Sequence, residues 1–581
     1  MKKYLNKWKV AFVVALSLFS CNELDLVQVD NPSTSSYFAT RGQFREALNE
    51  GYRPVWWKFD KSQNGIDDDF IRRAFLDAVK AGTIDSENGR ALTNWTDVYK
   101  IITRMLVVVD RIEADESILG DTDKAAFRGE AYFFLGAFWS YLINHYGDVP
   151  FFEESLTIDE SFVLSRTSKA EILPRIYEYF DIAIEGLPPN QDIADFVNKG
   201  TAYAFKARAA LLQNDYATAA TAAKGCMDLG VYDLHANFAD LFKSSTVNSD
   251  EIIFQLPNSV DFDQFNGNTK DFIPRNFGGF CARNPSWELL ATFECTDGLP
   301  IDESPLFDPQ NPFKNRDPRC AMTIVPFGSL EDGDGLGPDA GSNFNGIEYT
   351  PHPLRREVLD YSTGNMRVNN DTRSRQNFAS FNGLAWKKGI DEDWVDDLAE
   401  DSNDIWMRYA EVLLTYAEAK IELNQIDASV LKAINDVKER AYRGTGKSAP
   451  LVTSTNQAEL RLKVRNERRM EFANEGIRYM DLIRWRFAEK VFATGIIGQL
   501  NVTRSANPGG PLMDNLVNPG LYFWGQTPEI DEDGLPDFSG LLENDFCRIL
   551  ADTEFPEKQY LWPIPSAERE KNDNLSQNEG Y

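Results

Sequence analysis

The stretch TAYAFKARAALLQNDYATAATAAKGCMDL, residues 201–229, decides the fold of this chain. Small and apolar residues recur in it every three or four positions, the spacing that gathers them on one face of an α-helix. The polar turn Asn214-Asp215-Tyr216 divides the stretch into two such segments, 201–213 and 216–229. Because small side chains let two helices approach closely, the stretch predicts a tightly packed helix hairpin.

This hairpin resembles a tetratricopeptide repeat in the placement of its small residues, which are Ala204, Ala207, Ala210, Ala219, Ala222 and Ala223. Stacked hairpins bury a shared core that a single hairpin cannot form. Thr40 is placed to cap another helix, which begins near Gln43. Helical periodicity also recurs at 93–112, 124–146, 171–186, 405–423, 427–441 and 457–490. We therefore predict an all-α fold, a divergent tetratricopeptide-like helical-repeat scaffold.

The N-terminus has the pattern of an exported lipoprotein. Four lysines precede a short apolar run, residues 10–19, and Cys21 follows shortly after it. The run is too short to span a bilayer, so it predicts a cleaved signal peptide with Cys21 as the lipid-modified first residue. Several acyl chains hold a protein firmly, because each buried methylene contributes about 0.8 kcal/mol. An ordinary secretory signal with an incidental cysteine is the alternative.

Loop-rich segments interrupt the helical blocks. Glycine, proline, asparagine and aspartate recur every few positions in 237–403 and again in 495–557. Short strands are expected there, at 252–256 and 321–326. Long insertions of this kind are usually functional, and binding residues concentrate on loops. The predicted parts are a signal peptide (1–20), a tether (21–40), an N-terminal helical-repeat region (41–236), a loop-rich insertion (237–403), a C-terminal helical-repeat region (404–494) and a loop-rich C-terminal region packing on the scaffold (495–581).

Charge and cysteine content narrow the range of partners. The chain has 90 acidic and 60 basic residues and a net charge of −30, so nucleic acid and anionic lipid are unfavourable partners. No two cysteines have CxxC spacing, which argues against a zinc site or a dense disulfide framework. One bridge within the group that runs from Cys281 to Cys320, and free buried thiols, are both open predictions.

An ordered set of phrases resembles a known family. The phrases are RGEA (128–131) with YGDVP (146–150), ECTDG (294–298), RYAEVLL (408–414), RNERRMEFANE (465–475) with DLIRW (481–485), WPIP (562–565) and NLSQNEGY (574–581). Together they are similar to the SusD/RagB family of outer-membrane nutrient-binding lipoproteins of Bacteroidetes. The resemblance spans nearly the whole chain. Residues 22–25 (NELD) also look like the acidic signal that sends such lipoproteins to the cell surface.

The resemblance implies an architecture and a function. The family has about four tetratricopeptide-like helix pairs with loop-rich insertions. Its members are not enzymes: they cover a SusC-like TonB-dependent transporter, capture oligosaccharide and pass it inward. RagB-like members capture peptides or glycopeptides, and a structural lid without ligand contact is a further alternative. We expect a cell-surface protein, lipid-anchored to the outer membrane, without a cofactor and without a nucleic-acid partner.

Motifs of catalysis are missing from the sequence. It contains three histidines, neither HExxH nor GxSxG, and no glycine loop of the phosphate-binding kind. No carboxylate pair stands out as the acid and base of a glycosidase. The charged run 465–471 is expected to form ion pairs between helices, and Trp485 and Trp562 are expected to pack within the scaffold.

Glycan capture calls for aromatic rings on loops, because sugars stack their C–H faces on such rings while polar side chains bond the hydroxyls. Trp57 and Trp394 are the first candidates: Trp57 precedes a polar loop with Asn64 and Asp67, and Trp394 lies in an acidic segment. Helical geometry would set Trp56 and Trp57 about 100° apart, so one of them would face the ligand. A lone tryptophan can instead anchor its loop. Further candidates are Trp56, Trp287, Trp386 and Trp524.

Two acidic loops are weak candidates for calcium, which prefers several oxygen ligands on a flexible loop. Neither loop has the distal glutamate of the twelve-residue calcium loop, so solvated loops are the favoured interpretation and no metal is predicted. The candidate residues are Asp332, Asp334 and Asp339 in one loop, and Asp531, Asp533 and Asp537 in the other.

Overall fold

The computed structural model describes residues 37–58, 65–73, 75–114, 116–189, 196–265, 269–327, 343–390, 399 and 401–581. Helices dominate, and the strands are short. The longer helices are α2 (Arg41–Asn49), α3 (Gly89–Glu113), α4 (Asp121–Tyr146), α6 (Lys169–Gly186), α7 (Lys199–Leu212), α8 (Tyr216–Asp228), α12 (Tyr409–Glu422), α13 (Ala428–Tyr442), α14 (Gln457–Phe472) and α15 (Arg478–Trp485). Shorter helices are α5 (Ile158–Ser161), α9 (Thr269–Phe272), α10 (Trp287–Thr292), α11 (Pro318–Thr323), α16 (Ala488–Val491), α17 (Ser539–Glu543) and α18 (Ser566–Arg569).

The strands form small sheets at the borders of the helical part. β1 (Phe70–Arg72) pairs with β3 (Arg283–Pro285), β2 (Ile252–Leu256) with β8 (Asp404–Arg408), and β9 (Ile496–Gly498) with β12 (Arg548–Ala551), all antiparallel. A four-stranded sheet and a two-stranded sheet lie in the loop-rich segments; their strands are β4 (Asn343–Phe344), β5 (Ile347–Glu348), β6 (Glu357–Asp360), β7 (Asn365–Val368), β10 (Glu529–Ile530) and β11 (Pro536–Asp537).

The predicted hairpin at 201–229 is confirmed as α7 and α8. Asn198 caps α7 by accepting a hydrogen bond from the Thr201 amide (3.0 Å), and Asp215 caps α8 through the Thr218 amide (3.1 Å). Between them Asn214 adopts the left-handed conformation that ends the first helix (φ 58°). All of the alanines quoted above are buried, so the small side chains lie where the helices meet.

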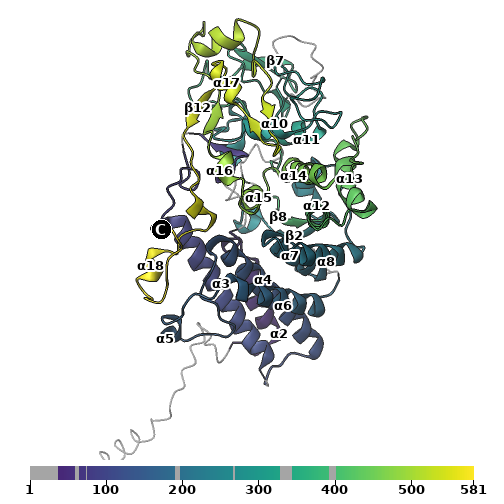
Figure 1. Ribbon diagram of the computed structural model, residues 1–581, viewed down its shortest axis with the longest axis vertical. Helices are drawn as coiled ribbons and strands as arrows, with labels where there is room; N and C mark the ends of the chain where they lie inside the picture. Colours follow the sequence, from purple (N-terminus) through teal and green to yellow (C-terminus); the bar gives the residue numbers. More distant parts are fainter. Residues whose placement is uncertain are drawn as a thin grey trace, which may run out of the picture.

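The long helices from α3 to α13 stack in chain order. α3 contacts α4, α4 contacts α6, α6 contacts α7, and α8 contacts α12, which contacts α13. Gly186 at the end of α6 brings this helix close to α4: a Cβ there would lie 2.4 Å from the Ala125 carbonyl oxygen. Figure 1 shows the result, an elongated molecule with α2–α8 at one end, α12–α15 in the middle and the loop-rich segments at the other end.

Some predicted boundaries are wrong for identifiable reasons. Residues 404–408 belong to strand β8 rather than to the helix predicted at 405–423, because they pair with β2. The helix predicted over 457–490 is broken between α14 and α15, where Asn474 and Gly476 take positive φ (65° and 80°). The first half of the strand predicted at 321–326 belongs to α11, and Ile324 forms an isolated bridge with Trp386, whereas the strand predicted at 252–256 is confirmed as β2.

The C-terminal segment returns to the first helices. The Trp562 amide donates to the His145 carbonyl (2.6 Å), and Asn578 Nδ2 donates to the Tyr146 carbonyl (2.9 Å). Trp562 is buried, as predicted, and its Nε1 donates to the Tyr479 hydroxyl (3.0 Å). The phrases YGDVP and WPIP, more than 400 residues apart in sequence, therefore meet at the end of α4.

The charged run at 465–471 forms a buried ion-pair network, as predicted. Glu471 of α14 accepts from Arg319 (3.0 Å), Arg408 (2.6 Å) and Arg440, which come from α11, β8 and α13. Burial alone would raise the pKa of Glu471, but these arginines outweigh it and hold the pKa well below the usual range. The network joins the helical scaffold to the loop-rich segment.

The cysteines of the described ranges are buried free thiols, so the disulfide bridge left open by the sequence does not form; they are Cys226, Cys281, Cys295, Cys320 and Cys547.

Trp485 is buried as predicted, and its Nε1 donates to Glu418 (2.8 Å). Within the described ranges, no helix has both the length and the apolar character that a bilayer crossing requires.

Candidate ligand-binding cavity

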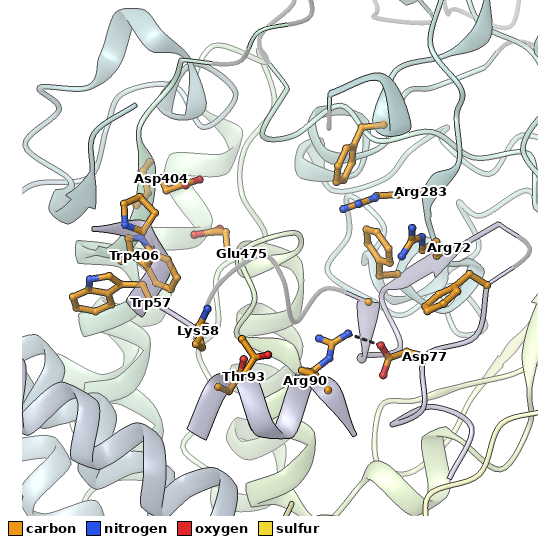
Figure 2. A pocket seen from close by; sticks show the side chains of 18 residues that line it. Trp57, Lys58, Arg72, Asp77, Arg90, Thr93, Arg283, Asp404, Trp406 and Glu475 are labelled. Atoms are coloured by element: carbon orange, nitrogen blue, oxygen red, sulfur yellow. Dashed lines mark hydrogen bonds and ion pairs between the residues drawn. The ribbon is translucent and has the colours of Figure 1, made fainter. Parts of the chain in front are cut away.

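A cavity of about 720 Å³ opens where the helical scaffold meets the loop-rich segment. Its walls come from β1 and β3, the first turn of α3, strand β8 and the residues that follow the 3₁₀ turn Pro54–Trp56. Binding cavities for small molecules usually measure 300–1,000 Å³. The volume is therefore sufficient for a few sugar units, and Figure 2 shows the side chains that surround it.

One side of the cavity is aromatic. The Trp57 side chain is fully buried, with its Nε1 donating to the Gly51 carbonyl (2.8 Å), and it packs on the phenylalanines of the scaffold. Trp406 of β8 covers it, with the ring centroids 5.5 Å apart, and is itself half-buried at the cavity wall. Trp406 is therefore the ring that a ligand can reach, and Trp57 supports it from behind.

Two acidic residues, Glu475 and Asp404, lie beside these rings in Figure 2. Glu475 accepts from Arg408 Nε (2.7 Å) and from Lys388 Nζ (2.5 Å). Burial alone would raise the pKa of Glu475, but attraction to Arg408 and Lys388 outweighs it and lowers the pKa below its usual range. Glu475 is thus a hydrogen-bond acceptor and does not supply a proton at neutral pH.

The first turn of α3 forms the floor of the cavity. Asn88 caps the helix by accepting from the amides of Arg90 (3.0 Å) and Ala91 (3.2 Å), which fixes the direction of the turn. Arg90 forms an ion pair with Asp77, and Thr93 is exposed. Lys58 lies nearby and pairs with Asp97 (3.0 Å).

The side opposite the tryptophans is cationic. Arg72 of β1 and Arg283 of β3 are directly opposed in the strand pair, and Figure 2 shows both on this side, with Arg90 on the helix below. Arg283 pairs with Asp271 (3.1 Å), and Arg72 lies over the ring of Phe75 (4.5 Å). Phe75 is 50% exposed. The cavity thus combines partly exposed aromatic rings with charged hydrogen-bonding groups.

Among the described residues, the tryptophans that the sequence predicts as ligand-binding residues are buried, and only some of them lie near the cavity. Trp57 reaches the cavity wall, but as a buried support. Trp56 is also buried, below Arg104 (4.9 Å). The loop-rich part has a hydrophobic core of its own, separate from that of the helical scaffold. It contains Trp287, Trp386 and Trp524, whose rings are fully buried. For these rings the expectation of an exposed stacking surface is wrong, because each anchors its own segment.

The remaining predicted residues are outside the cavity or outside the described ranges. Asp67 is buried, and burial together with Asp69 raises its pKa well above the usual range. Asp531 of the second acidic loop forms an ion pair with Lys490 (2.9 Å). Cys21, Asn64, Trp394, Asp332, Asp334 and Asp339 lie outside the residues that the structure describes.

Sequence reasoning missed Trp406, Arg72, Arg90 and Arg283. Helical periodicity places Trp406 in a helix, because the apolar run Ile405-Trp406-Met407 has no alternation that would signal a strand. Strand β8 forms there through its pairing with β2. The three arginines carry no local signal, since they meet only through the pairing of β1 with β3 and the position of α3.

Comparison with known proteins identifies the family. Residues 250–581 match the model of the SusD family. Residues 49–211 match a second model, described as starch-binding associating with outer membrane. Because the first match covers more than half of the chain, the chain belongs to the SusD family, a family of carbohydrate-binding proteins.

Individual relatives agree over most of the chain. SusD-like protein P2 of Formosa agariphila is 24% identical over 512 residues, 84% of this chain and 92% of that protein. A SusD-like carbohydrate-binding protein from Bacteroides fragilis is 27% identical, has a TM-score of 0.73, and the match covers 93% of this chain and 99% of the other. Surface glycan-binding protein A from Bacteroides uniformis is similar in fold, with a TM-score of 0.59 and 17% identity, over 93% of this chain and 99% of that one.

Proposed function

We propose that this protein captures an oligosaccharide in the cavity between β1–β3 and β8. The observation that carries the proposal is the composition of the wall, with partly exposed Trp406 and Phe75 between charged groups. A sugar ring offers a flat C–H face to an aromatic ring and hydroxyls to polar side chains. Membership of the SusD family, and relatives named as carbohydrate- or glycan-binding, support the same ligand class.

The captured oligosaccharide is then delivered to a SusC-like TonB-dependent transporter in the outer membrane. The protein is held at the outer surface of that membrane through acylated Cys21, and its helix pairs serve as a tetratricopeptide-like scaffold with the sequence divisions given above. The family description, which names association with the outer membrane, supports this location.

The proposed role is binding without catalysis. A glycosidase needs one carboxylic acid that is kept protonated near the scissile bond. Glu475, the carboxyl beside Trp406 whose pKa is lowered, is fixed as a carboxylate by Arg408 and Lys388.

Calorimetric titration tests the proposal. The full chain is titrated with oligosaccharides of plant, host and microbial origin and with peptide mixtures, next to the variant Trp406→Ala. We expect one glycan class to bind, and Trp406→Ala to weaken that binding by about 1–3 kcal/mol, as aromatic stacking contributes on bases.

Phe162→Ala is the matched control, since Phe162 is an exposed aromatic residue (45%) outside the cavity wall. It should leave binding unchanged, and thermal unfolding should confirm that both variants fold. Binding of peptides alone, or glycan binding that is insensitive to Trp406→Ala, would contradict the proposal.

A further inference from the structure

Two arginines face each other across the strand pair at the cavity. Arg72 of β1 and Arg283 of β3 are direct cross-strand partners in the antiparallel register. Like charges in directly opposed positions destabilise a strand pair. The pair therefore costs stability unless something anionic lies next to it.

The acidic residues present compensate this charge only in part. Asp271 pairs with Arg283 (3.1 Å), and Asp77 pairs with Arg90. Arg72 is exposed, and within the described part of the chain no acidic side chain pairs with it. Among the described residues its guanidinium lies over the ring of Phe75 (4.5 Å), a contact that does not use the N–H donors of the group.

Two neighbouring arginines, Arg73 and Arg275, add further positive charge near the strand pair. Arg73 Nη1 donates to the Phe280 carbonyl (2.7 Å), and Arg275 Nη1 donates to the same oxygen (3.3 Å), so two further guanidinium groups lie beside the strand pair. The chain as a whole carries a net charge of −30. A molecule with this net charge repels anions as a whole. The positive charge at this strand pair is therefore a local feature of the cavity wall.

We propose that Arg72 and Arg283 bind the acidic group of a charged sugar, a carboxylate or a sulfate ester, so that the ligand is an anionic oligosaccharide. This inference rests on the proposed glycan binding and specifies its substrate class. A guanidinium donates two parallel hydrogen bonds to a carboxylate or sulfate, which fixes the orientation of the group. With the arginines on one side and Trp406 on the other, the acidic sugar and a stacked ring would occupy opposite sides of the cavity.

The test compares matched ligands on the full chain. Oligosaccharides that contain uronate and oligosaccharides that contain sulfate are each titrated beside a neutral counterpart, made by methyl esterification or by desulfation. Acidic peptides form a further arm. Titrations at low and high salt follow the electrostatic part of the binding, which salt screens.

Arg72→Gln should weaken binding of the acidic ligand about tenfold, the effect of losing a charged hydrogen bond. Arg72→Lys should lose less, because it retains the charge without the planar fork. Arg443→Gln removes an exposed positive charge outside the cavity wall and should change nothing. Arg283→Gln is the second variant, and thermal unfolding confirms that each variant folds.

The inference is supported if an acidic oligosaccharide binds more tightly than its neutral counterpart, salt weakens the binding, and Arg72→Gln removes the preference. The uronate and sulfate arms then decide which group is bound. Equal binding of the neutral counterpart, with loss in Trp406→Ala, would overturn the inference while the proposed function stands. Binding of acidic peptides alone, or of no glycan at all, would overturn both.

Discussion

At the scale of single residues, one carboxylate joins several elements. Glu471 accepts hydrogen bonds from arginines of α11, β8 and α13, and all of these side chains are buried. A buried ion pair adds little net stability compared with an apolar replacement, but removal of one partner leaves the others uncompensated. Because β8 also carries Trp406, the same network fixes the strand that forms the aromatic wall of the cavity.

Glu471→Gln should therefore destabilise the protein by about 3–5 kcal/mol, the usual cost of breaking a buried pair. Unfolding in urea, followed by circular dichroism, measures the change in free energy. Glu439→Gln is the control: Glu439 is exposed on α13, and its replacement should change stability by less than about 0.5 kcal/mol. Equal stability of the two variants would show that the network is not needed for folding.

At the scale of elements, periodicity and turn residues located most of the long helices, because those signals are local, but they missed the break between α14 and α15. The hairpin of α7 and α8 was predictable from its alanines and from Asn214-Asp215. The strands at 404–408 and 283–285 were not, since a short strand is stabilised by its partner rather than by its own sequence. For the same reason the cavity could not be predicted from the sequence. Its residues Arg72, Arg283 and Trp406 come together only after these strands pair.

The contact between α4 and α6 gives a prediction at this scale. Gly186→Ala would place a Cβ 2.4 Å from the main-chain oxygen of Ala125, so the helices must separate. We expect a loss of about 1–3 kcal/mol, as for other overpacked sites. Gly42→Ala is the helical control: Gly42 is exposed in α2, where a Cβ has its nearest contact at 3.8 Å. A thermal unfolding midpoint that does not fall in Gly186→Ala would refute the close approach of α4 and α6.

At the scale of the whole molecule, the N-terminal sequence predicts attachment to a membrane. Cys21→Ala should move the protein from the membrane fraction to the soluble fraction, because acyl chains supply the membrane affinity. Fractionation and immunoblotting measure the distribution, and Ser35→Ala serves as the control that should stay bound. Retention of Cys21→Ala in the membrane fraction would show that the protein is held in another way.

The proposed function places an oligosaccharide in one cavity, between the helical scaffold and the loop-rich segment. The most direct measurement is a crystal structure of the protein with the oligosaccharide that binds most tightly in titration. We expect density for a sugar ring against Trp406, with an acidic group next to Arg72 and Arg283. An oligosaccharide bound elsewhere on the molecule, with the cavity free of sugar, would contradict it.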